Sequence, residues 1–214
     1  MLRNDSYSGW YRCHICVEGF ILRKKSHLSL AGYIVDVVDA DMIDHPLAFR
    51  FGSLEPDLVP TFITTKHRID LTFHKLEKKI NKVIDEYDKN KGMTIGLSKD
   101  LGIITHYIAD YFTFPHNIQY PGTMTEHIHY EAQLKVDFRE FVQKMKEKHA
   151  HFQEVNMQSA DEICTFIRKC HEEYLHAVKS VENDCRYILQ ICAQVVGAIL
   201  HLLQQNSMPL GCYM

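Results

Sequence analysis

The spacing of apolar residues constrains the fold of this chain more than any other feature of its sequence. Between Ile69 and Tyr87, and again between Tyr174 and Leu202, apolar side chains recur every three or four positions, which is the period of one α-helix face. No window of the sequence alternates convincingly between apolar and polar residues, as a half-buried strand would. The sequence therefore predicts an all-α fold built from several helices.

The same periodicity and the end signals place individual helices. Shorter apolar faces predict helices at residues 31–38, 69–87, 98–112 and 134–145. A final long helix is expected to begin at a capping box, Ser159-x-x-Glu162, and to run as far as Leu202. Its stripe should be core, with Cys185 and Cys192 acting as small buried apolar groups.

Length and composition indicate how the chain is organised. Its 214 residues suffice for one domain with a sizeable core, which we place at residues 23–214. Residues 1–22 show no clear period and are interpreted as an N-terminal extension that need not belong to the core fold. They contain Trp10 and the pair Cys13-x-x-Cys16, which we interpret as incidental thiols because no second such pair occurs.

Charge and apolar content exclude several partners. With 24 basic and 27 acidic residues the chain has no basic field for binding duplex nucleic acid. The longest apolar stretch, residues 188–203, is interrupted by Gln190, Gln194 and His201, so it predicts a buried helix rather than a transmembrane segment.

Seven cysteines, an odd number, and no recognisable signal peptide favour a reducing compartment, and a cytoplasmic location is expected. The sequence gives no indication of oligomeric state.

Histidine is unusually frequent, with 14 residues, and two of these histidines form a repeated pattern. His106 and Asp110 are four residues apart, as are His127 and Glu131, and His116 lies between the two pairs. Residues four apart share a helix face, so each pair can converge on one cation. A single such pair is usually a surface interaction, but two pairs with an intervening histidine favour a metal site. Mixed histidine and carboxylate ligands suit zinc.

The other histidines have simpler interpretations. His129 should point away from the face shared by residues 127 and 131. His45 either approaches the site or starts a helix, and His74 is a weak candidate for a supporting role. We expect four further histidines to lie at the surface: His149, His151, His171 and His176.

The residues 101–116 carry the pattern His106-Tyr107-x-x-Asp110-x5-His116, and His127-x-x-Tyr130-Glu131 follows. In spacing, these motifs resemble the bacterial zinc-dependent phospholipase C family. The glutamate of the second motif favours the phospholipase branch over the related zinc-dependent single-strand nucleases. Weaker matches lie upstream at Ser26-His27-Leu28, Gly52-x4-Asp57 and His67. The resemblance covers residues 24–150 and adds the expectation of a long closing helix.

The resemblance implies an all-α fold with zinc ions in a cleft. The first zinc would be held by Asp57, His67, His106 and Asp110, and the second by His116, His127 and Glu131. Asp110 would bridge to a third zinc, with His27 as a further ligand. In relatives a terminal tryptophan completes that third site, whereas Trp10 is not terminal here, so two zinc ions are expected.

The resemblance also implies the chemistry. A metal-bound hydroxide would attack the phosphorus of a phospholipid-type phosphodiester, and Asp57 is the candidate general base. Leu58 stands where choline-specific relatives carry an aromatic residue, so recognition of choline is not implied. Two alternatives stay open. Nuclease activity on single strands ranks lower because the chain offers few stacking platforms. A zinc-binding protein without catalysis is the other alternative.

Overall fold

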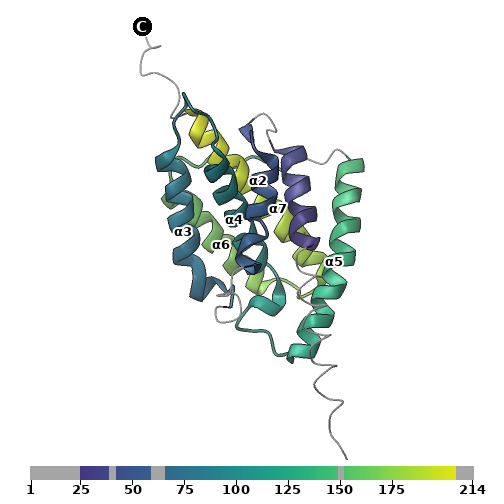
Figure 1. The fold of residues 1–214 in the computed structure, drawn as a ribbon. Helices are drawn as coiled ribbons and strands as arrows, with labels where there is room; N and C mark the ends of the chain where they lie inside the picture. Colours follow the sequence, from purple (N-terminus) through teal and green to yellow (C-terminus); the bar gives the residue numbers. More distant parts are fainter. Residues whose placement is uncertain (1–24, 39–41, 59–65, 149–151, 206–214) are drawn as a thin grey trace, which may run out of the picture.

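The computed structural model describes residues 25–38, 42–58, 66–148 and 152–205. Within these residues every regular element is helical (Figure 1), so the all-α prediction is confirmed. In chain order the elements are a helix over residues 25–37, α2 (Pro46–Gly52), the 3-10 helix η2 (Glu55–Asp57), α3 (Ile69–Glu86), α4 (Ile95–Tyr111), the 3-10 helix η4 (Phe114–His116), α5 (Met124–Glu147), α6 (Ala160–His176) and α7 (Val181–Gln205). The extension proposed at residues 1–22, with Trp10 and the Cys13/Cys16 pair, lies outside the described residues.

Helix α4 is the central helix of the fold. Every residue from Leu97 to Tyr111 except Lys99 is buried, and the helix packs against α2, α3 and α7 (Figure 1). The Thr94 side chain caps the helix by accepting a hydrogen bond from the Leu97 backbone N–H at 3.2 Å. A helix buried on all faces is held on every side by its neighbours. Its last two turns are therefore a rigid support for functional side chains.

Helix α2 approaches α4 so closely that only glycine fits at the contact. A Cβ atom added at Gly52 would lie 2.0 Å from the Lys99 carbonyl oxygen. One added at Gly102 would lie 2.1 Å from the Phe49 carbonyl oxygen. This contact brings Ser53, and with it the following helix η2, against the side of α4.

The predicted last helix is in fact two helices, which corrects the expectation of one continuous helix after Ser159. Helix α6 ends at His176, and α7 begins at Val181 after its own cap, in which the Ser180 hydroxyl accepts from the Asn183 N–H at 3.2 Å. Val178 fitted the apolar stripe but is 75% exposed, because it lies in the connection. Cys185 and Cys192 are buried, as expected.

The helix starts also differ in detail from the prediction. Ser159 caps α6 by accepting from the Glu162 N–H at 3.2 Å, but the Glu162 carboxylate accepts from the Gln158 N–H instead of completing a capping box. A complete capping box lies at the start of α5, between Thr123 and Glu126.

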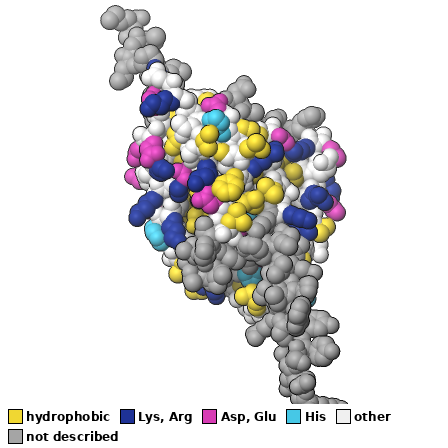
Figure 2. Space-filling view, viewed as in Figure 1, with side chains coloured by type: hydrophobic (Ala, Val, Ile, Leu, Met, Phe, Trp, Pro, Cys, Tyr) yellow, Lys and Arg dark blue, Asp and Glu magenta, His cyan; other side chains and the backbone are white. Residues whose placement is uncertain are grey.

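Helix α7 is long and apolar enough to cross a membrane by length and composition. However, 72% of its most apolar window is buried inside the fold, which is the packing of a core helix. Figure 2 shows basic and acidic side chains interspersed over one face of the molecule, in keeping with the near balance of 24 and 27 such residues in the sequence.

Candidate metal centre

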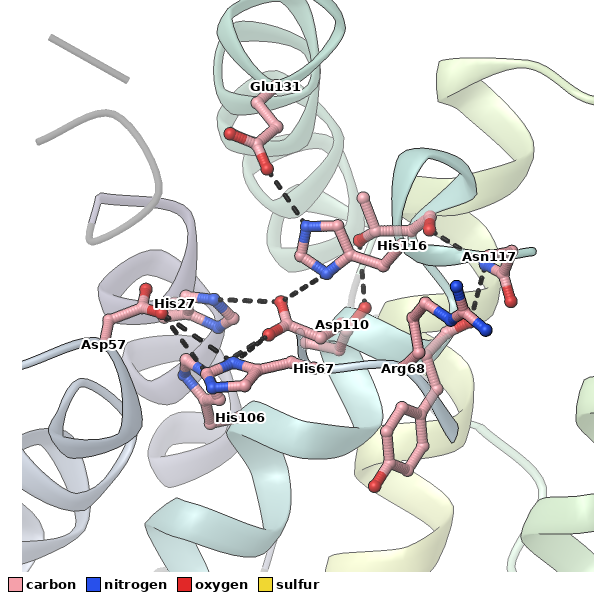
Figure 3. Close-up of polar contacts among 12 residues, drawn as sticks. His27, Asp57, His67, Arg68, His106, Asp110, His116, Asn117 and Glu131 are labelled. Carbon is pink, nitrogen blue, oxygen red and sulfur yellow. Dashed lines mark hydrogen bonds and ion pairs between the residues drawn. The ribbon is translucent and has the colours of Figure 1, made fainter. Parts of the chain in front are cut away.

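Segments distant in sequence bring eight histidine and carboxylate side chains together beside α4. Two come from its last two turns, and the others come from the helix over residues 25–37, from η2, from the segment before α3, from η4 and from α5 (Figure 3). They fall into three groups whose ligand atoms lie within 4.8 Å of one another: His67, His106 and Asp110; His116, His127 and Glu131; and His27, Asp57 and His106. The structure thus gathers every residue predicted as a ligand, and their role in binding metal stays a prediction.

The first group is organised around His106. Its Nδ1 donates to the Ser53 carbonyl oxygen at 2.9 Å, so Nε2 is the ring nitrogen left to bind a metal ion. That nitrogen is 3.2 Å from Asp110 Oδ2 and 3.0 Å from His67 Nδ1. His67 Nδ1 lies 2.8 Å from the same Asp110 oxygen. A hydrogen bond that fixes the tautomer of a ligand histidine is a common feature of metal sites.

The second group joins η4 to α5. Glu131 Oε1 lies 2.7 Å from His127 Nε2 and 3.0 Å from His116 Nε2. The opposite ring nitrogen of His116, Nδ1, lies 3.3 Å from Asp110 Oδ1. Asp110 therefore turns one oxygen to each group. An ion held by His116 Nε2 would be supported by a carboxylate behind the ring.

The third group shares a ligand atom with the first. Both groups include His106, whose Nε2 can bind only one ion at a time. His27 stacks on the His106 ring at 4.1 Å between centroids, and its Nε2 is 3.4 Å from Asp110 Oδ1. Burial and the neighbouring His106 lower the pKa of His27, so its ring is neutral. The described residues thus offer two ligand sets that have no residue in common, and His27 is a further candidate ligand beside them.

The polar groups of the site fit a bound cation. Asp57 is only 2% exposed, and neither of its oxygens has a hydrogen-bond partner among the described residues. Its Oδ1 lies 3.7 Å from His106 Nε2 and 3.8 Å from His67 Nδ1, which is too far for hydrogen bonds. A buried carboxylate without donors is costly unless a cation compensates it. Histidine nitrogens with carboxylate oxygens form a donor set that zinc prefers.

The charge of Asp110 also fits a bound cation. Burial alone would raise its pKa, but His116 and His106 hold the pKa well below its usual range. The carboxylate is therefore ionised at neutral pH and available as a ligand.

Helix η4, which carries His116, is fixed by Asn117 and His171, to which the sequence analysis gave no role in the site. Asn117 Nδ2 donates to the carbonyl oxygens of Tyr111 at 3.1 Å and Thr113 at 2.9 Å. The amide oxygen of Asn117 accepts from His171 Nε2 at 2.7 Å. These bonds tie the end of η4 to α4 and α6.

The surface prediction for His171 is wrong, because this side chain is only 5% exposed. Its position four residues after Ile167 and three before Tyr174, both buried on α6, was the signal that placed it on the apolar face. The remaining histidines are less central. His74, His129 and His176 are exposed, and His45 is the residue that precedes α2. His149 and His151 lie outside the described residues.

The fold and the site together define a class of protein: an all-helical protein whose clustered histidines and carboxylates could hold metal ions. The zinc dependent phospholipase C family model matches residues 26–184, well over half of the chain, and the chain belongs to this family. The matched region includes all eight residues of the centre. No curated protein and no solved structure gives a significant match.

Proposed function

We propose that this protein is a zinc-dependent phosphodiester hydrolase that acts on phospholipid-type phosphodiesters. The observation that carries the proposal is the pair of ligand sets joined by Asp110, whose Oδ2 is 2.8 Å from His67 and whose Oδ1 is 3.3 Å from His116. Family membership supports the same reaction class. A phosphodiester carries its charge on two phosphoryl oxygens, and two adjacent cation sites suit such a group.

The proposed ligands form two groups, one for each zinc ion. His67, His106 and Asp110 would hold one zinc ion, and His116, His127 and Glu131 would hold a second. When bound, these ions would stabilise charge on the phosphoryl oxygens and supply a nucleophile from water at neutral pH.

Asp57 is the proposed proton acceptor. Its Oδ1 faces the first group, at 3.7 Å from His106 Nε2. Its Oδ2 has no hydrogen-bond partner among the described residues, so one oxygen can contact the ion while the other accepts a proton. The Asp57 side chain is almost fully buried, so this proton acceptor is shielded from bulk water.

A small cavity beside the group of His116, His127 and Glu131 supports the zinc site proposed there. It has a volume of about 30 Å³, room for about one water molecule. Its polar side is formed by His27, Asp110, His116 and Glu131, and its apolar side includes Leu134 and Phe138.

The test combines elemental analysis with turnover. The purified protein should contain two zinc ions per chain and hydrolyse a chromogenic phosphodiester and phosphatidylcholine. His106→Ala and Glu131→Ala should each lose bound zinc and at least about 100-fold in turnover. His129→Ala is the matched control, because His129 is exposed on the same helix as Glu131 and should leave both unchanged.

The outcomes separate the alternatives. A protein without bound zinc, or unchanged turnover in His106→Ala, would reject the proposal. Zinc binding without turnover of any phosphodiester would indicate a metal-binding protein without catalysis. Faster turnover of single-stranded DNA than of phosphatidylcholine would indicate a nuclease.

A further inference from the structure

Asp184 is a buried carboxylate that lies outside the metal centre but is bonded to two of the elements that build it. It belongs to the first turn of α7 and is 0% exposed. Its Oδ2 accepts from the Phe114 backbone N–H at 2.8 Å and from the Tyr130 hydroxyl at 2.8 Å. Its Oδ1 accepts from the Tyr174 hydroxyl of α6 at 2.7 Å.

The two donors to Oδ2 sit beside the second ligand set. Phe114 is the first residue of η4, and His116 is the third. Tyr130 directly precedes Glu131 and follows His127 by three residues on α5. One carboxylate oxygen therefore fixes the separation between the helix that carries His116 and the helix that carries Glu131.

The charge of Asp184 suits this role. Burial raises its pKa to about 6, while the bonds from Phe114, Tyr174 and Tyr130, with Lys179 nearby, favour the ionised form. At neutral pH the carboxylate is ionised and accepts all three hydrogen bonds. Bonds to an ionised acceptor are roughly twice as strong as bonds between neutral groups.

We infer that Asp184 is a positioning residue that sets the geometry of the His116, His127 and Glu131 ligand set through Phe114 and Tyr130. The inference rests on the metal centre of the proposed function. A carboxylate that only stabilised the junction of α6 and α7 would need the Tyr174 bond alone. The bonds to Phe114 and Tyr130 reach across to the elements that hold the metal ligands.

Two tyrosine variants separate these roles. Tyr130→Phe and Tyr174→Phe each remove one hydroxyl bonded to the same carboxylate, but only the first acts on α5. Asp184→Ala would remove all three hydrogen bonds at once and disturb the junction of α6 and α7. The test therefore compares the two tyrosine variants. Zinc binding is followed by calorimetric titration of the metal-free protein, and cobalt(II) absorption spectra report the ligand geometry without any need for turnover.

Tyr130→Phe should weaken the binding of one of the two zinc ions by about 10-fold and alter the cobalt(II) spectrum. Tyr174→Phe should leave both affinities within about twofold of wild type and keep the spectrum, because removing its hydroxyl leaves both Oδ2 bonds in place. Equal effects of the two variants, or no effect of Tyr130→Phe, would overturn the inference alone. Wild-type protein that binds no zinc would refute the proposed function and this inference with it.

Discussion

The close contact between α2 and α4 makes Gly102→Ala a sharp test of how the fold positions the site. The added methyl group would lie 2.1 Å from the Phe49 carbonyl oxygen and 2.8 Å from the Ser53 nitrogen, both backbone atoms that cannot rotate away. Ordinary contact begins at 3.4 Å, so α2 must shift by about 1.3 Å. Ser53 moves with α2, and its carbonyl oxygen is the atom that accepts from His106 Nδ1 at 2.9 Å.

The expected change in the free energy of unfolding follows from opposing contributions. Overpacking costs about 1–3 kcal/mol, loss of the His106 hydrogen bond costs about 1 kcal/mol, and alanine gains about 0.5–1 kcal/mol over glycine within a helix. We expect Gly102→Ala to lower the free energy of unfolding by about 2 kcal/mol, measured by urea denaturation of the metal-free protein. It should also weaken zinc binding to the first group by about 10-fold, since His106 loses its orienting bond.

Gly197→Ala is the matched control for this experiment. Gly197 lies within α7, and a Cβ atom built there has no heavy atom within 4 Å. The same substitution should therefore stabilise the protein by about 0.5–1 kcal/mol and leave zinc binding unchanged. If both variants changed stability with the same sign, or if Gly102→Ala bound zinc as tightly as wild type, the proposed coupling between the helix contact and the site would be wrong.

Three further outcomes are expected. Thr123→Ala removes the capping box of α5 and should lower the free energy of unfolding by about 1 kcal/mol in urea denaturation; an unchanged value would contradict the cap. Burial lowers the pKa of His171 from 6.5 to about 4, so as the pH falls from 6.5 to 4 the unfolded chain gains a proton that the folded chain does not. Wild type should lose about 3 kcal/mol more than His171→Gln over this range, measured by denaturation at pH 7 and pH 4, whereas His176→Gln should behave as wild type. Chelation of zinc should lower the thermal midpoint, because free zinc at 100 times its Kd contributes about 2.7 kcal/mol per site, and an unchanged midpoint would argue against a loaded centre.

Local periodicity explains which parts of the fold could be predicted. The apolar spacing from Ile69 to Tyr87 predicted α3, which spans Ile69–Glu86, because the spacing of a helix face depends only on the helix itself. The break between α6 and α7 was missed because Val178 continues the apolar spacing although it lies in the connection. The Ser180 cap that starts α7 is a single hydroxyl, and the sequence contains many of these.

The same distinction applies to the candidate metal centre. The pairs His106/Asp110 and His127/Glu131 could be predicted because helix geometry places residues four apart on one face. His27, Asp57 and His67 reach the site from separate segments, so only the family resemblance suggested them. The bonds that fix η4, from Asp184 and from His171 through Asn117, depend on how α6 and α7 pack, which no local pattern encodes.

Asp110 explains why the site depends on the packing of the whole fold. Each of its oxygens faces a different ligand set, and its backbone belongs to the last turn of the most buried helix. The first set is held from one side by α2 through Ser53, and the second from the other side by α7 through Asp184. A shift of α4 relative to either neighbour would change the distances to both sets at once, since a single carboxylate joins them. The burial of α4 on all sides is therefore what keeps the two sets at a fixed separation, and the proposed binding of a phosphodiester between two cations would require that separation to be constant.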